Sequence, residues 1–121
     1  MAHKYTGGVN NSDDLGFFRA MFDKLIAEDV ADAKRIYITG GSNGGVMTYM
    51  LLSEMADRIA GAGVVVTTLP AIVKTWPKPS RSVPILIMLG TAYLMMPWSG
   101  TRGLQQAISA RDVRPVGLGL Q

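Results

Sequence analysis

The chain has 121 residues, of which 48% are hydrophobic and 17% charged, and this balance describes a globular chain with one modest core rather than a disordered segment. The net charge of +3 is small and scattered, so no basic stripe with interleaved aromatic side chains points to nucleic acid. Cysteine is absent, which excludes disulfides and thiolate metal sites, and the single histidine, His3, has no carboxylate cluster near it in the sequence. We therefore expect neither a metal nor a cofactor.

The sequence also bears on membrane association, oligomeric state and the number of domains. No signal peptide is visible at the N-terminus and no apolar run approaches membrane-spanning length, so we expect a soluble chain without a membrane partner, in a compartment that the sequence leaves open. The hydrophobic fraction is high for the length, which favours apolar surface covered by a second subunit and hence a homo-oligomer. We expect a single domain over residues 1–121.

The N-terminal third predicts an arm followed by a helix. Residues 1–11 are polar and contain glycine, which indicates a loop. Ser12 followed by Asp13 and Asp14 predicts a helix start, with the hydroxyl as the cap and the two acids against the helix dipole. Apolar residues then recur at intervals of three and four, which predicts an amphipathic helix as far as Ala27 with a stripe formed by Leu15, Phe18, Phe22, Leu25 and Ile26 and widened by Phe17 and Met21.

The rest of the chain alternates apolar runs with a second helical pattern. The pattern predicts strands over 35–39, 63–67 and 83–89, helices over 43–60 and 101–110, a surface excursion over 70–82, and a loop over 90–100 that carries Tyr93 and Trp98. The methionines of the helix over 43–60 are expected to fill the core rather than bind a ligand. This order predicts a small three-layer α/β sandwich with a short, mostly parallel sheet.

A glycine-flanked serine lies between the first predicted strand and the second predicted helix. Gly40, Ser42 and Gly44 fit the G-x-S-x-G pattern of a nucleophile elbow. A strand that reverses into a helix within a few residues forces the serine into a strained backbone conformation, and small neighbours let the turn close. The hydroxyl is then exposed at a helix N-terminus, where developing negative charge is favoured. The glycine loops that bind dinucleotides or phosphates have patterns that this chain lacks.

Four segments in order carry a family resemblance: NNSDDLGFFRAMFDKL, RIYITGGSNGGVMTYML, VPILIMLGTA and MPWSG. Across residues 5–100 the chain resembles the polyhydroxybutyrate depolymerase and feruloyl esterase group of α/β-hydrolases. The resemblance implies hydrolysis of a small-molecule ester through an acyl-enzyme. Ser42 would attack, and the backbone N–H of Asn43 would donate one hydrogen bond to the oxyanion.

The chain departs from this family at the other catalytic positions. The family's triad aspartate position holds Tyr93, and no histidine follows His3. The early strands are also missing, together with the loop that supplies the second oxyanion donor. The sequence therefore resembles the middle portion of an α/β-hydrolase, truncated, with a nucleophile but without its usual base.

Several arrangements remain open for the missing groups. His3 of the same or a neighbouring subunit is one candidate base, and a lysine or aspartate in a rearranged site is another. Tyr93 is a candidate for polarising the substrate carbonyl or bonding Ser42, and Trp98 for lining an acyl or aryl pocket, although both residues also fit simple packing roles. Two functional classes follow: a weakly active serine carboxylesterase for short-chain or aryl esters, and a non-catalytic α/β-hydrolase fragment that retains the elbow.

Overall fold

The structure, a computed structural model, describes residues 12–92. The chain divides into two units, Met1–Met88 and Leu89–Gln121, and every helix and strand given below belongs to the first. The predicted arm over 1–11 and the predicted helix over 101–110 lie outside the described residues. A single domain over residues 1–121 stays a prediction.

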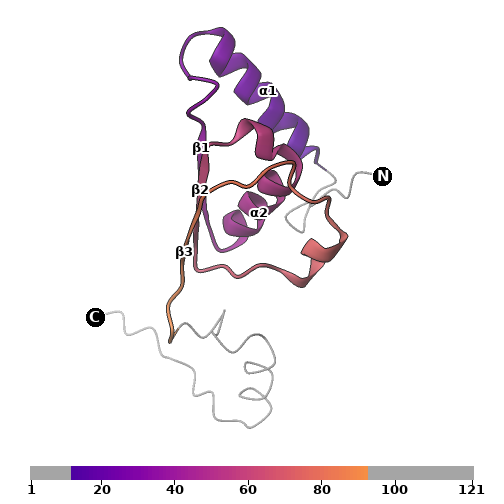
Figure 1. The fold of residues 1–121 in the computed structure, drawn as a ribbon, viewed down its shortest axis with the longest axis vertical. Coiled ribbons are helices and arrows are strands. Elements are labelled where there is room, and N and C mark those ends of the chain that lie inside the picture. The colour runs from indigo at the N-terminus through magenta and orange to yellow at the C-terminus, as the bar shows by residue number, and fades with distance from the viewer. Residues whose placement is uncertain (1–11, 93–121) are drawn as a thin grey trace, which may run out of the picture. The chain divides into compact units, whose positions relative to one another are not determined.

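The first unit is built on a short parallel sheet (Figure 1). Its strands are β1 (Tyr37–Gly41), β2 (Gly61–Val65) and β3 (Ile85–Met88), in the spatial order β1-β2-β3. Both neighbouring pairs are parallel, with Tyr37 opposite Gly61 and Val65 opposite Met88. The predicted α/β class with a short parallel sheet is confirmed.

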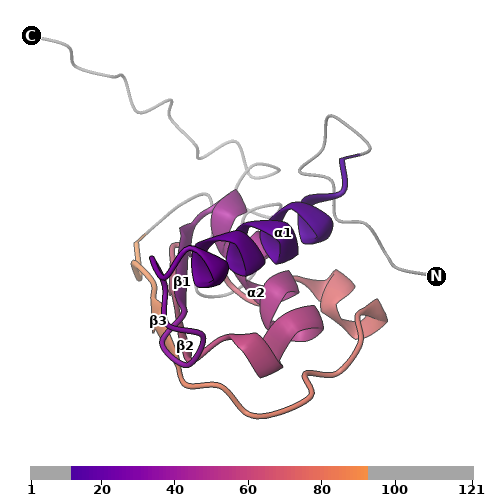
Figure 2. The ribbon, with the colours of Figure 1, turned by 90° about the horizontal axis from the view of Figure 1, so that it is seen from above.

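The helices lie on one face of this sheet, as the view from above shows (Figure 2). They are α1 (Asp14–Ala27) and α2 (Asn43–Met55), with short 3-10 turns η1 (Ala56–Arg58) and η2 (Ala71–Thr75). Among residues 12–92 the opposite face carries no helix, so the third layer of the predicted sandwich is not seen in this part of the chain.

The core lies between the helices and the sheet in two clusters. One is formed by buried side chains of α1, α2 and the segment that follows α2: Phe22, Leu51, Leu52, Met55 and Ile59. The other joins α2 to β2 and to the long β2–β3 connection: Tyr49, Met50, Val64 and Trp76. Met50 and Met55 are both 1% exposed, which confirms their predicted role as core residues.

The helix boundaries differ from the prediction at two ends. Asp13, not Ser12, caps α1, because its carboxylate accepts a hydrogen bond from the Gly16 N–H at 3.0 Å. Helix α2 ends at Met55 instead of residue 60, and Arg81 donates hydrogen bonds from its guanidinium to the carbonyls of Ala56 (2.9 Å) and Ile59 (2.5 Å). A residue that lies far away in sequence thus adds hydrogen bonds to two carbonyls just beyond the end of α2, one of which, that of Ala56, also accepts from the Ile59 N–H at 3.3 Å.

Strand boundaries are shifted by about two residues at either end of the predicted runs. A turn holds residues 32–35 out of β1, since Asp32 accepts hydrogen bonds from the Lys34 N–H (2.8 Å) and the Arg35 guanidinium (2.9 Å). These two bonds, the first above all, hold the pKa of Asp32 below its ordinary value. Strand β2 stops at Val65, because Val66 has a positive φ of 51° that leaves the extended conformation.

Two aromatic side chains are placed differently from the prediction. Phe17 is 63% exposed and does not widen the apolar stripe of α1. Trp76 lies in the predicted surface excursion but is only 7% exposed, because it packs in the core cluster with Tyr49, Met50 and Val64. The β2–β3 connection is therefore anchored to the core at its middle.

Replacing Trp76 by alanine tests this anchor. Trp76→Ala should lower the free energy of unfolding by about 3 kcal/mol, because large-to-small changes in a core lose transfer energy and leave a cavity. Leu69→Ala, in the same connection but at a side chain that is 56% exposed, is the matched control and should change it by no more than about 0.5 kcal/mol. Urea denaturation followed by circular dichroism measures both, and equal effects would contradict the anchoring role.

Candidate functional site

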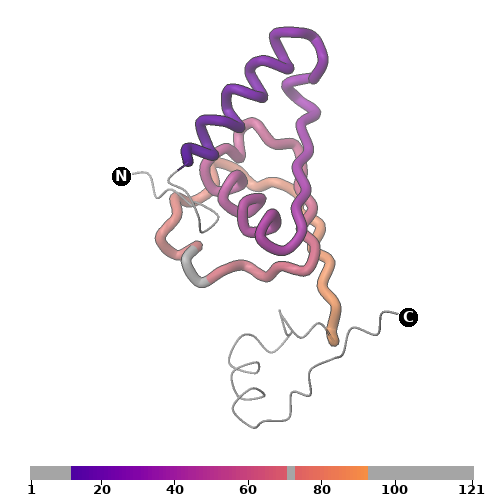
Figure 3. Tube along the Cα trace, turned by 180° about the vertical axis from the view of Figure 1, so that it is seen from behind, coloured from indigo at the N-terminus to yellow at the C-terminus, as the bar shows by residue number. Residues whose placement is uncertain are grey.

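The chain turns from β1 into α2 through a single residue, Ser42. Strand β1 ends at Gly41 and helix α2 begins at Asn43, and Figure 3 shows the abrupt change of direction between them. Ser42 has φ 51° and ψ −118°, a left-handed conformation that L-residues rarely adopt and that costs roughly 1–3 kcal/mol. The predicted strand–serine–helix junction is thus present in the structure.

Backbone hydrogen bonds hold Ser42 on both sides. Its N–H donates to the Val65 carbonyl at 3.0 Å, which extends the β1–β2 pairing by one residue. Its carbonyl accepts from the N–H groups of Gly45 (2.9 Å) and Val46 (3.3 Å) and so starts the hydrogen-bond pattern of α2. The strained residue is therefore fixed by the ends of two regular elements.

Two of the glycines around Ser42 are required by close contacts. A Cβ on Gly40 would lie 2.1 Å from the Gly44 carbonyl oxygen, and one on Gly45 would lie 2.6 Å from the Thr67 hydroxyl oxygen. A Cβ on Gly44 would meet nothing within 4 Å. The steric need for small residues therefore falls on Gly40 and Gly45, whereas the second glycine of the G-x-S-x-G pattern contributes its backbone alone.

Ser42 stands in a position suited to chemistry at its hydroxyl. It is exposed, as is Asn43 after it, and the Ser42 side chain makes no capping hydrogen bond to α2. The first turn of α2 contains no acidic side chain that would offset the positive end of the helix dipole. Because the sheet is parallel, Ser42 lies at the carboxyl end of β1, the edge at which open α/β sheets bind ligands.

One contact to this junction was not predicted from the sequence. The Thr67 hydroxyl donates a hydrogen bond to the Ser42 carbonyl at 2.5 Å. Thr67 was predicted only as the last residue of a strand, and the G-x-S-x-G pattern gives no signal for a residue 25 positions away. Only the fold brings the two together.

The other predicted site residues lie outside the described part of the chain. His3, Tyr93 and Trp98 fall within 1–11 and 93–121, so their predicted roles stay predictions. Residues 12–92 contain no histidine. Over the same residues no group of three or more His, Cys, Asp or Glu side chains gathers in a way that would hold a metal ion, and no helix has the length and apolarity needed to cross a bilayer.

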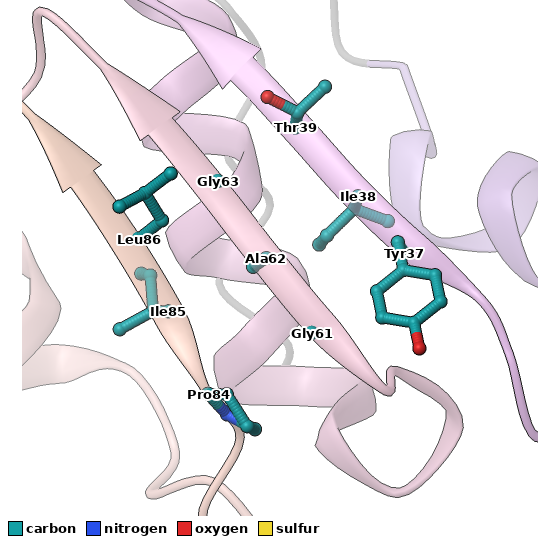
Figure 4. Close-up of a pocket in the computed structure, with 9 residues that line it drawn as sticks. All are labelled: Tyr37, Ile38, Thr39, Gly61, Ala62, Gly63, Pro84, Ile85 and Leu86. Atoms are coloured by element: carbon teal, nitrogen blue, oxygen red, sulfur yellow. The ribbon is translucent and has the colours of Figure 1, made fainter.

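A shallow apolar depression of about 510 Å³ lies on the sheet face away from the helices (Figure 4). It is lined by residues of all three strands, among them Tyr37, Gly61, Gly63 and Leu86, and Ser42 does not line it. Tyr37 is 70% exposed and Leu86 65%. The depression is therefore separate from the serine junction, and the predicted homo-oligomer, which would cover such a surface, stays a prediction.

A parallel sheet whose strand passes through a strained, glycine-flanked serine into a helix is the arrangement found in α/β-hydrolases. The comparisons with known proteins agree with this class. Residues 3–71, more than half of the chain, match the prolyl oligopeptidase family, and the chain belongs to that family.

Relatives with esterase names also match. The chain is 32% identical over 87 residues to "Putative esterase NocK" of Nocardia uniformis subsp. tsuyamanensis, covering 72% of this chain and 25% of that protein. It is 30% identical over 109 residues to feruloyl esterase B of Piromyces equi, covering 88% of this chain and 20% of that protein. A 55-residue stretch, 46% of this chain, is 33% identical to 8% of the bifunctional acetylxylan esterase/xylanase XynS20E of Neocallimastix patriciarum. No solved structure matches.

These relatives refine the resemblance drawn from the sequence. The α/β-hydrolase superfamily is confirmed, and a feruloyl esterase is among the relatives. Membership of the polyhydroxybutyrate depolymerase group stays a prediction. The chain spans about a quarter of NocK and a fifth of feruloyl esterase B, so the activities named for those proteins are not properties shown for this chain.

Exchanging each flanking glycine for alanine tests the geometry of the junction. Gly40→Ala should prevent the native turn from forming, because its Cβ would overlap the backbone of Gly44. Gly44→Ala should leave the fold intact and raise the free energy of unfolding by about 0.5–1 kcal/mol, since alanine is preferred over glycine within a helix. Thermal unfolding of the two variants gives the comparison, and equal stability of both would contradict the described turn.

Proposed function

We propose that this chain carries the nucleophile of a serine carboxylesterase, with Ser42 as the attacking residue. The observation that carries the proposal is the conformation of Ser42, φ 51° and ψ −118°, at the junction of a parallel strand and a helix. Backbone strain of this kind persists where the surroundings impose it and is concentrated at functional sites. Membership of the prolyl oligopeptidase family and the esterase names of the relatives support the same class of reaction.

The proposed reaction has two steps. In the first, the Ser42 oxygen bonds to the ester carbonyl carbon and its proton passes to a base, which gives it to the departing oxygen as the carbon–oxygen bond of the ester breaks and the alcohol leaves. In the second, water attacks the acyl carbon and gives a proton to the base, the bond between the acyl carbon and the Ser42 oxygen breaks, the base passes the proton to that oxygen, and the carboxylic acid is released. No cofactor enters either step.

The N-terminus of α2 suits the negative charge that develops on the carbonyl oxygen. Asn43 follows Ser42 at the start of this helix, and its backbone N–H is the proposed oxyanion donor. The helix dipole adds to this effect at the same end, where no acidic side chain opposes it. The second donor is not assigned to a described residue.

The base is the open part of the proposal. His3 is the only histidine of the chain and therefore the first candidate, acting on Ser42 of its own or of a neighbouring subunit. Loss of a triad histidine in a serine hydrolase costs on the order of 10⁶-fold in turnover and leaves roughly 10³–10⁴-fold over water. That residual rate comes from binding and the oxyanion hole, so a chain without a working base would still hydrolyse an activated aryl ester slowly.

The proposed substrates are short-chain or aryl esters, with Tyr93 and Trp98 as candidates for contacts to the acyl or aryl group. The names of two relatives, feruloyl esterase B and the acetylxylan esterase/xylanase XynS20E, support this class, since they describe esters of an aromatic acid and of acetate. The alternative is a non-catalytic chain that keeps the junction without a working base.

Covalent labelling and hydrolysis measured together test the proposal. A fluorophosphonate probe should form a bond between phosphorus and the Ser42 oxygen with loss of fluoride, and mass spectrometry of the labelled peptide should locate it. Ser42→Ala should abolish labelling and reduce hydrolysis of p-nitrophenyl acetate to the residual rate that binding and the oxyanion hole supply without a nucleophile. Ser82→Ala, which removes an exposed serine outside the junction, should behave as the parent chain.

His3→Ala separates the remaining possibilities. Activity lost in both the Ser42 and His3 variants would assign the base to His3, whereas activity lost only in the Ser42 variant would leave a serine esterase with another base. Equal rates in the parent chain and both variants, with no labelling of Ser42, would favour the non-catalytic alternative.

A further inference from the structure

Thr67 is the residue outside the serine motif that is most closely tied to it. It follows β2 by two positions and is fully buried, with 0% of its surface exposed. A buried hydroxyl needs a hydrogen-bond partner. Its shorter hydrogen bond, at 2.5 Å, goes to the carbonyl of Ser42, a residue 25 positions away in the sequence. The hydroxyl therefore connects two segments that are distant along the chain.

Val65 and Thr67, two residues of one short segment, both form hydrogen bonds with the backbone of Ser42. The Thr67 hydroxyl donates to the Ser42 carbonyl at 2.5 Å, and the Val65 carbonyl accepts from the Ser42 N–H at 3.0 Å. The Thr67 hydroxyl also lies 3.3 Å from the Val65 carbonyl oxygen. Both peptide groups next to the Ser42 Cα are therefore held by residues 65–67, and rotation about its φ and ψ would break one of these bonds.

The backbone between Val65 and Thr67 has an unusual conformation at Val66. Val66 has a φ of 51°, which a β-branched residue adopts only when its surroundings impose it. Its N–H donates to the Met88 carbonyl at 2.8 Å, which fixes it to β3. Because Val66 leaves the extended conformation here, Thr67 turns toward Ser42 instead of continuing the strand.

The side chain of Thr67 also fits the space left by Gly45. An added Cβ on Gly45 would lie 2.6 Å from the Thr67 oxygen and 2.7 Å from its Cβ. The absence of a side chain at Gly45 thus lets Thr67 reach the first turn of α2. The glycine and the threonine form a matched pair across the junction.

We propose that Thr67 is a positioning residue: its hydroxyl holds Ser42 in the left-handed conformation that presents the Ser42 oxygen at the edge of the sheet. The consequence for catalysis rests on the proposed function of Ser42, whereas the consequence for the backbone does not. Thr67 touches no reacting atom in this account and acts through the carbonyl of Ser42 alone.

The test compares replacements that separate the hydroxyl from the shape of the side chain. Thr67→Val keeps the shape and removes the donor, whereas Thr67→Ser keeps the donor and removes a methyl group. Thr67→Val should slow fluorophosphonate labelling of Ser42 by about 10- to 100-fold, since a displacement near 1 Å costs up to about 100-fold. In ester hydrolysis the loss should fall on kcat with KM nearly unchanged, and Thr67→Ser should stay within about threefold of the parent chain.

Nuclear magnetic resonance supplies a readout that does not depend on activity. The three-bond coupling between the amide and α protons of Ser42 reports its φ, and it should change in Thr67→Val but not in Thr67→Ser. Thr68→Val, at the exposed neighbouring threonine, should change neither the coupling nor the labelling rate. If Thr67→Val does not fold, Thr67→Ala is compared with Thr67→Ser instead, because these two variants also differ in the presence of the hydroxyl.

The outcomes separate this proposal from the proposed function. A parent chain that is never labelled, together with a Ser42 coupling that changes when the Thr67 hydroxyl is removed, would refute the esterase and support the positioning role. If Thr67→Val shows the same Ser42 coupling and the same labelling rate as the parent chain, the positioning role is overturned and the proposed esterase function is unaffected. If Thr67→Ser is as impaired as Thr67→Val, the positioning role of the hydroxyl is also overturned, since the packing of the threonine methyl group would then be responsible.

Discussion

The structure depends on one residue being held in a conformation that its own chemistry disfavours. Ser42 has no glycine-like freedom, yet it takes a φ of 51° between β1 and α2. The hydrogen bonds that impose this come from its N–H to Val65 and from Thr67 to its carbonyl, both at the end of β2. The sheet register, the start of α2 and the exposure of the serine hydroxyl are therefore aspects of the same constraint.

The sequence allowed the elements to be predicted where their signals are local. The periodicity of α1 and the apolar runs of the strands depend on neighbours within a few residues, and both kinds of element were confirmed. The methionines of α2 were also correctly assigned to the core, since an apolar helix between other elements has few alternatives. Element boundaries were less accurate, because hydrogen bonds from residues distant in sequence, such as those of Arg81 to the carbonyls that follow α2, leave no local signal.

What could not be predicted arises from pairs that are distant in sequence. The burial of Trp76 depends on a space between α2 and β2, and the role of Thr67 depends on its hydroxyl reaching the Ser42 carbonyl beyond the ends of β1 and β2. Neither contact corresponds to a residue spacing that can be recognised in the sequence. The pattern also gave both glycines of the motif equal importance, whereas the steric demand lies on Gly40 and on Gly45, one position beyond the motif. The predicted base and pocket residues, His3, Tyr93 and Trp98, are not among the residues described.

The open space at Gly44 has a consequence for how this kind of site can diversify. The position lies two residues from the serine on the exposed first turn of α2, and its Cβ direction is unobstructed. The Cβ of a residue introduced there would meet no atom within 4 Å, so the packing beneath the turn would stay as it is. Chains that share this junction can therefore vary at this position by single substitutions, without disturbing the close contacts at Gly40 and Gly45 that the turn requires.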